Sequence, residues 1–144
     1  MADSLSKIFT TATSGLSAQS IRMNTIASNL ANAGTVGGSD DTTYHKKYPI
    51  FSEVTNAIQG LSPQDQPIGG VQVTDVKSSE TPLQRRYDPK NPTADSEGYV
   101  YLTDVNPIEE MTNMISASKE YEANVEIMNT AKNLMSQSIN VLKE

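Results

Sequence analysis

The sequence contains no cysteine and no tryptophan, and only two phenylalanines among its 144 residues. Without cysteine, neither a disulfide framework nor thiol chemistry is available. Hydrophobic residues make up only 36% of the chain, so a large globular core is not expected. No run is long and apolar enough to span a bilayer or to act as a cleavable signal peptide. We therefore expect a protein that stays in the cytoplasm or leaves by a route that reads no cleavable signal.

Basic residues are also scarce, with 11 Lys and Arg against 17 Asp and Glu, for a net charge of −6. Nucleic acid is a poor candidate partner, because phosphate binding requires clustered basic residues. The single histidine, His45, has no second His or Cys with which to form a dyad or a metal site. No phosphate-binding glycine loop, nucleophile elbow or EF-hand pattern is present. The sequence predicts no enzyme, no metal site and no cofactor.

A long helix is predicted after Asp104. Asn106 supplies an N-cap side chain, Pro107 suits the first helical position, and Glu109 and Glu110 place carboxylates at the positive end of the helix dipole. Counting onward in steps of three and four selects a coiled-coil seam, interrupted by the polar Ser118 and Lys132. Its apolar members are Met111, Met114, Tyr121, Val125, Met128, Met135, Ile139 and Leu142.

The same spacing runs from Asp3 to Ala33, which predicts a partner helix ending near Gly34 in a left-handed residue. The large apolar residues of this second seam are Leu5, Phe9, Leu16, Met23, Ile26 and Leu30. The two helices are expected to pair as a coiled-coil-like hairpin.

The outer face of the first helix has unusually little charge, since its only charged residues are Asp3, Lys7 and Arg22. Small and amide side chains allow close approach and hydrogen bonding across a contact, which favours a subunit–subunit assembly surface. A simple hairpin with a polar outside remains about as compatible with the periodicity alone. The predicted assembly residues are Ser14, Gln19, Ser20, Asn24, Ser28, Asn29, Asn32, Ser118, Asn124 and Lys132.

Residues 34–104 are rich in glycine and proline, and short alternating runs predict three or four strands at 50–54, 71–76, 81–87 and 98–102. We expect one small antiparallel sheet covered by the long helices. The predicted fold is mainly α with a small β-rich middle region. Its parts are an N-terminal helix at 1–33, the middle region at 34–104 and a C-terminal helix at 105–144.

Several short segments together form a recognisable signature: Ser14–Gln19, Arg22–Asn24, Ala27–Ala33, Tyr87–Pro89, Asn91–Pro92, Ala94–Asp95, Gly98–Val100, Glu110–Met111, Ser118, Tyr121, Ala123–Val125 and Asn129. The N-terminal segments resemble the bacterial flagellar axial proteins of the rod and hook, and those from Tyr87 to Asn129 resemble the proximal rod branch in particular. The basic pair Arg85 and Arg86 departs from the family pattern.

The resemblance implies a structural subunit of the flagellar basal-body rod. Such a subunit would pass through the flagellar type III export apparatus without signal cleavage, stack helically in the periplasm with copies of itself and other rod proteins, and transmit motor torque. It implies no membrane insertion. The alternative from the helical pattern alone is a cytoplasmic adaptor or chaperone-like protein that binds a partner helix.

Overall fold

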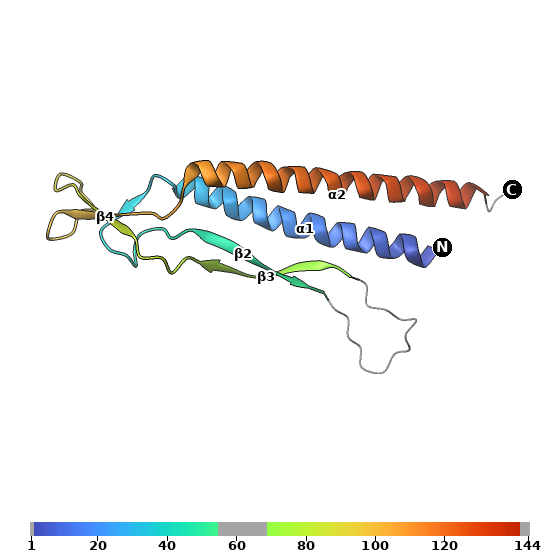
Figure 1. Cartoon of the computed structure of the whole chain (residues 1–144), viewed down its shortest axis with the longest axis horizontal. Coiled ribbons are helices and arrows are strands. Elements are labelled where there is room, and N and C mark those ends of the chain that lie inside the picture. The colour runs from blue at the N-terminus through green and yellow to red at the C-terminus, as the bar shows by residue number, and fades with distance from the viewer. Residues whose placement is uncertain (1, 55–68, 142–144) are drawn as a thin grey trace, which may run out of the picture.

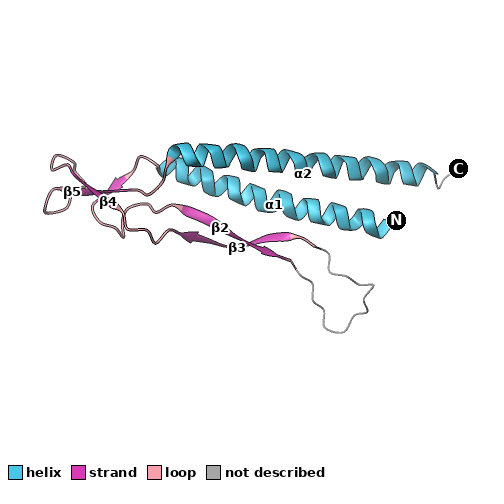
Figure 2. Ribbon diagram, in the orientation of Figure 1, coloured by secondary structure: helices cyan, strands magenta, loops and turns pink. Residues whose placement is uncertain are grey.

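The computed structural model describes residues 2–54 and 69–141, and within them the chain forms an elongated molecule (Figure 1). Two long antiparallel helices lie side by side, with the N- and C-terminal ends of the chain at the same end of the molecule. A two-stranded hairpin runs along the first helix, and a small sheet lies at the end opposite the termini (Figure 2). The predicted class, mainly α with a small antiparallel β region, is confirmed.

Helix α1 spans Ala2–Asn32 and helix α2 spans Pro107–Val141. The predicted start of α2 is confirmed in detail. The Asn106 side-chain oxygen accepts hydrogen bonds from the backbone N–H groups of Ile108, at 3.0 Å, and Glu109, at 3.4 Å. Because the first N–H groups of a helix have no partner within the helix, this cap fixes the residue at which α2 begins.

The end of α1 differs from the prediction. Gly98 is the only residue with positive φ in the described part of the chain, so Gly34 does not adopt the left-handed conformation. The backbone N–H of Thr35 instead donates to the carbonyl of Asn32 at 3.0 Å, and the Thr35 hydroxyl donates to the same oxygen at 2.8 Å. The Thr35 side chain thus satisfies the Asn32 carbonyl at the end of α1, a role that a left-handed glycine was expected to make possible through the backbone.

The strands form two separate sheets, whereas the sequence predicted one. Strands β2 (Lys47–Glu53) and β3 (Val71–Ser78) pair as an antiparallel hairpin with an irregularity between Ile50 and Phe51. The second sheet has the order β1-β5-β4, and all its pairs are antiparallel. Its strands are β1 (Val36–Gly37), β4 (Gln84–Tyr87) and β5 (Tyr99–Leu102).

Only one of these sheets meets a helix. Within the described ranges, α1 packs against α2, β2 and β3, whereas no helix packs against β1, β4 or β5. Helix α1 therefore lies between α2 and the β2–β3 hairpin, and the three-stranded sheet has a small core of its own around Val100, which is fully buried. The expectation that the long helices cover a single sheet is wrong, because the chain uses α1 to cover the hairpin alone.

Candidate assembly site

The contact between the helices is made mainly by small and polar side chains. Along α2 the most buried positions recur at intervals of seven, and Glu110, Ala117 and Ala131 are at most 4% exposed. Asn124 continues this column and faces Gly15 of α1, where an added Cβ would lie 3.0 Å from the Asn124 side-chain nitrogen. Small side chains at a helix contact shorten the distance between the axes. The two helices therefore pack closely.

A second column of α2 also faces α1, and it coincides with part of the predicted seam. Met114, Tyr121 and Met128 are half-buried, and the Thr13 hydroxyl of α1 lies 3.9 Å from the Met128 sulfur. The other predicted column is displaced by one residue from the buried one, so Met111 is 57% exposed and lies outside the contact. The prediction followed the larger apolar residues, whereas burial follows the alanines and polar residues beside them.

The remaining predicted seam residues vary in burial. On α1, Ile26 is buried, Phe9 is exposed, and Leu16, Met23 and Leu30 are half-buried. On α2, Val125 is half-buried, whereas Met135 and Ile139 are exposed. The Leu5 side chain and Leu142 lie outside the described residues.

A polar clasp joins the two helices to the loop that leads into β2, together with the first residue of that strand, and Asn29 is its centre. The Asn29 side chain is 1% exposed. Its amide nitrogen donates to the Lys47 carbonyl and to the Glu110 carboxylate, both at 2.8 Å. Its oxygen accepts from the Tyr44 hydroxyl and the Lys47 N–H, both at 2.9 Å. One side chain thus holds α1, α2 and the loop in a fixed relation.

Glu110 supplies the charged half of the clasp. Its carboxylate, 1% exposed as a residue, lies 3.1 Å from the Lys46 ammonium, which also contacts Glu109 at 2.7 Å. Partial burial lowers the pKa of Lys46, but the hydrogen bonds and charges of Glu109 and Glu110 outweigh it, so the pKa is raised above 10.5. A buried charge requires such pairing.

Most of the predicted assembly residues on α1 face the same chain. Asn29 is buried in the clasp, which excludes it from an outward contact. Ser28 hydrogen-bonds to Tyr44, Gln19 to Glu120, and Ser14 accepts from the N–H of Val71 in β3. Asn32 donates to the Ser28 carbonyl. The low charge of this face is explained by the β2–β3 hairpin, which covers it within the chain.

The members that remain accessible are fewer. Asn24 and Lys132 are exposed, and Ser20 and Ser118 are half-exposed. Asn124 is not among them, because it faces Gly15 of α1.

An uncovered apolar surface lies on α2, where sequence reasoning did not place it. Ile108, Met111 and Ile115 are 76%, 57% and 59% exposed, and at steps of three and four they share one face of the helix. The sequence contained the evidence for this surface, because the three residues lie next to the buried positions of α2 and repeat at the same spacing of three and four. This group is called the outer stripe below.

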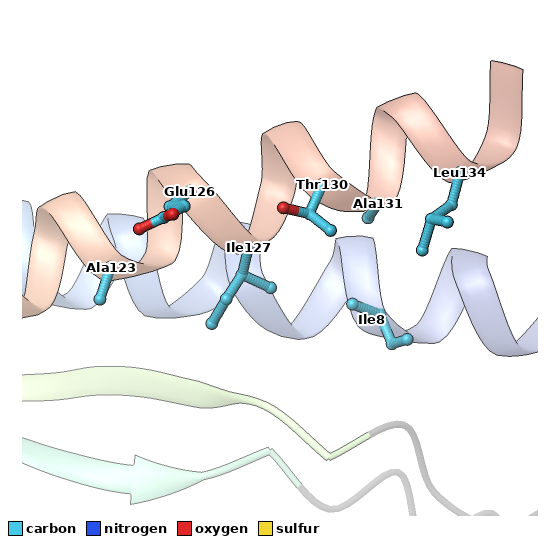
Figure 3. A pocket seen from close by; sticks show the side chains of 7 residues that line it. All are labelled: Ile8, Ala123, Glu126, Ile127, Thr130, Ala131 and Leu134. Carbon is cyan, nitrogen blue, oxygen red and sulfur yellow. The ribbon is translucent and has the colours of Figure 1, made fainter. Parts of the chain in front are cut away.

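A groove near the free ends of the helices forms a second apolar surface. It has a volume of about 440 Å³ and is lined by residues of both helices. Figure 3 shows Ile8 of α1 below Ala131 and Leu134 of α2, with Ile127 to one side. Ala123 and the Glu126 carboxylate lie beyond Ile127, at the margin of the groove. We call this the terminal groove.

An elongated two-helix frame with a small core and uncovered apolar faces defines a structural subunit that packs against other chains. Residues 9–37 match the family described as flagella basal body rod protein, and residues 96–141 match the flagellar basal body rod FlgEFG protein C-terminal family. Flagellar basal-body rod protein FlgC of Escherichia coli O6:H1 is 44% identical over 94% of this chain and 96% of its own length. FlgC of Salmonella typhimurium is 43% identical over 94% of this chain and 96% of its own length. FlgC of Borreliella burgdorferi is 36% identical over 92% of this chain and 93% of its own length. The chain belongs to the FlgC family and is a structural subunit of the flagellar basal-body rod.

No helix in the described ranges is long and apolar enough to cross a membrane.

Proposed function

We propose that this subunit builds the proximal rod by packing its helices among copies of itself and other rod proteins, and that the assembled rod transmits motor torque in the periplasm. The flagellar type III export apparatus is the proposed route to that location. The observation that carries the proposal is the outer stripe of α2, because three large apolar side chains are left in contact with solvent on a single helix face.

Burial of the outer stripe would supply a substantial driving force. A fully buried Ile or Met side chain contributes about 1.5–3 kcal/mol relative to an exposed one. Three such residues on one helix face can form the apolar core of a subunit interface. The terminal groove adds an apolar contact at a different place on the frame. Contacts at separate surfaces allow a subunit to be held by several neighbours, which torque transmission requires.

The accessible polar residues of the frame complete the proposed contact. Asn24, Ser20, Ser118 and Lys132 are placed to make hydrogen bonds or ion pairs with neighbours, whereas the residues that bond within the chain act by fixing the shape of the frame. Charge-assisted and polar contacts at the margin of an apolar patch mainly set orientation and specificity.

The test replaces Ile115 by Glu, with Ile115→Leu as the matched control. Because Ile115 is 59% exposed in the isolated chain, both variants should unfold within about 0.5 kcal/mol of the parent. In cells lacking the parent chain, the leucine variant should support motility and appear in purified basal bodies, and the glutamate variant should do neither. Normal incorporation of Ile115→Glu would refute the role of the outer stripe.

Cell fractionation tests the wider proposal. A rod subunit co-purifies with basal bodies, whereas the alternative cytoplasmic adaptor would stay in the soluble fraction.

A further inference from the structure

The three-stranded sheet presents a basic, aromatic face that its own chain leaves open. Strand β4 is at the edge of the sheet, and all four of its residues are exposed. Successive side chains on a strand point to opposite faces, so Arg85 and Tyr87 share one face and Arg86 lies on the other. Tyr87 is 63% exposed.

Tyr99 of β5 contacts both side chains of this face. The Arg85 guanidinium lies 5.5 Å from the centre of the Tyr99 ring, and the rings of Tyr87 and Tyr99 meet edge to face at 5.2 Å. Arg85 has no ion pair within the described residues, whereas Arg86 lies 4.0 Å from Asp88. Tyrosine and arginine are the residue types most enriched at interface hot spots. The face formed by Arg85, Tyr87 and Tyr99 is called the tyrosine face.

The terminal groove has the complementary chemistry. Its walls are apolar, and its volume of about 440 Å³ falls in the range of roughly 300–1,000 Å³ that accommodates small ligands, so an aromatic side chain fits. Glu126 stands at its margin, and Glu122 lies one turn earlier on the same helix. Both are exposed and form no ion pair in the part of the chain that the structure describes.

The two surfaces lie toward opposite ends of the elongated molecule, since the tyrosine face is in the sheet away from the termini and Ile8 and Leu134 are near them (Figure 2). A single chain therefore cannot bring them together. Two copies can, and Arg85 of one copy is then complementary in charge to Glu126 and Glu122 beside the groove of the other.

We propose that the tyrosine face of one copy binds the terminal groove of a second copy, with Tyr87 in the groove and Arg85 paired with Glu126. This proposal rests on the assembly of the chain into a rod and names the surfaces that one pair of copies uses. The contact joins two different surfaces, which is the kind of contact that extended assemblies repeat. Arg85 thus has a defined function despite its departure from the family pattern.

The test exchanges the two charges. Arg85→Glu and Glu126→Arg each place like charges opposite one another, which in an interface lowers binding strongly, and each should reduce the number of copies per basal body by about tenfold or more. A chain carrying both substitutions restores the attraction and should regain normal incorporation. A mixture of the two single variants should also assemble, because each supplies the surface that the other needs.

Arg86→Glu is the matched control, because it makes the same charge change at the adjacent position on the opposite face. It should assemble like the parent. Since the sequence has no cysteine, Tyr87→Cys together with Ile127→Cys provides a direct probe, and the pair should crosslink between copies in intact basal bodies.

The outcomes separate this proposal from the proposed function. If the double variant stays as defective as the single ones, if Arg86→Glu fails like Arg85→Glu, or if either single variant assembles normally, the contact between these surfaces is refuted and the rod function stands. If the parent chain is absent from basal bodies, the rod function itself fails. Circular dichroism of the exposed-site variants verifies that all of them are folded.

Discussion

Replacing Asn29 by Ala tests whether the polar clasp holds the frame together. Four hydrogen bonds converge on this side chain at 2.8–2.9 Å. Its removal leaves the N–H and carbonyl of Lys47 without the partners that they have in the clasp. The Glu110 carboxylate also loses one of three partners, the others being Lys46 and Asn113. Tyr44 keeps its hydrogen bond to Ser28.

The magnitude follows from these losses. A buried polar group left unsatisfied costs about 1–3 kcal/mol, and two backbone groups together with a weakened carboxylate site give about 2–4 kcal/mol for Asn29→Ala. This is a large part of the free energy of unfolding of a typical domain, about 5–15 kcal/mol. With a urea slope of about 2 kcal/mol per molar, the midpoint should fall by about 1–2 M.

The assay is urea unfolding of the purified chain followed by circular dichroism, with Asn24→Ala as control. Asn24 is exposed on the same helix, so its substitution should change the free energy of unfolding by no more than about 0.5 kcal/mol. Hydrogen exchange should show the loss of protection in α1, the start of α2 and residues 44–47 together. If Asn29→Ala loses no more stability than Asn24→Ala, the clasp is not the element that joins these three segments.

Two further predictions concern the same frame. Ala117→Leu inserts a large side chain at a position that is 0% exposed between the helices. It should destabilise the chain by about 1–3 kcal/mol in urea, whereas Lys119→Leu, on an exposed position of the same turn, should not. The raised pKa of Lys46 predicts that its contribution to stability is fully present below its ordinary pKa of 10.5 and is lost as the pH rises through the raised pKa. The free-energy difference between the parent and Lys46→Met should therefore be constant at neutral pH and narrow in alkaline solution, and a difference that stays unchanged would contradict the ion pair with Glu109 and Glu110.

The features that the sequence predicted well are those with local causes. The start of α2 depends on Asn106 and Pro107, which act within one turn and are recognisable in any sequence. Strands β2 to β5 were also located to within a few residues, since alternation and turn residues are local signals. The two-residue β1 was not predicted. The two long helices follow from a spacing of three and four that persists over many turns.

The features that the sequence did not predict depend on tertiary contacts between segments that are distant in the chain. Periodicity selects the buried face of a helix only to within a residue. The column of Ala117 and the neighbouring column of Met111 both fit the spacing of three and four, and the structure buries the first. The low charge of α1 indicated a covered face, but the β2–β3 hairpin, which covers it, was not identifiable from composition. Asn29 was selected as an outward residue because nothing in the sequence relates it to Glu110, 81 positions later.

The arrangement of α1 has a consequence for the timing of folding. Its partners all follow it in the chain, and its contacts with α2 join residues 81–115 positions apart. Loop closure over such separations is slow, and α1 alone has ten Ser or Thr residues and a glycine, which weaken an isolated helix. During synthesis from the N-terminus, the pairing of α1 with α2 cannot be completed until the segment up to Ala131 has been made. The nascent chain therefore passes through a long interval in which α1 can pack only against the β2–β3 hairpin, and the two-helix frame is completed last.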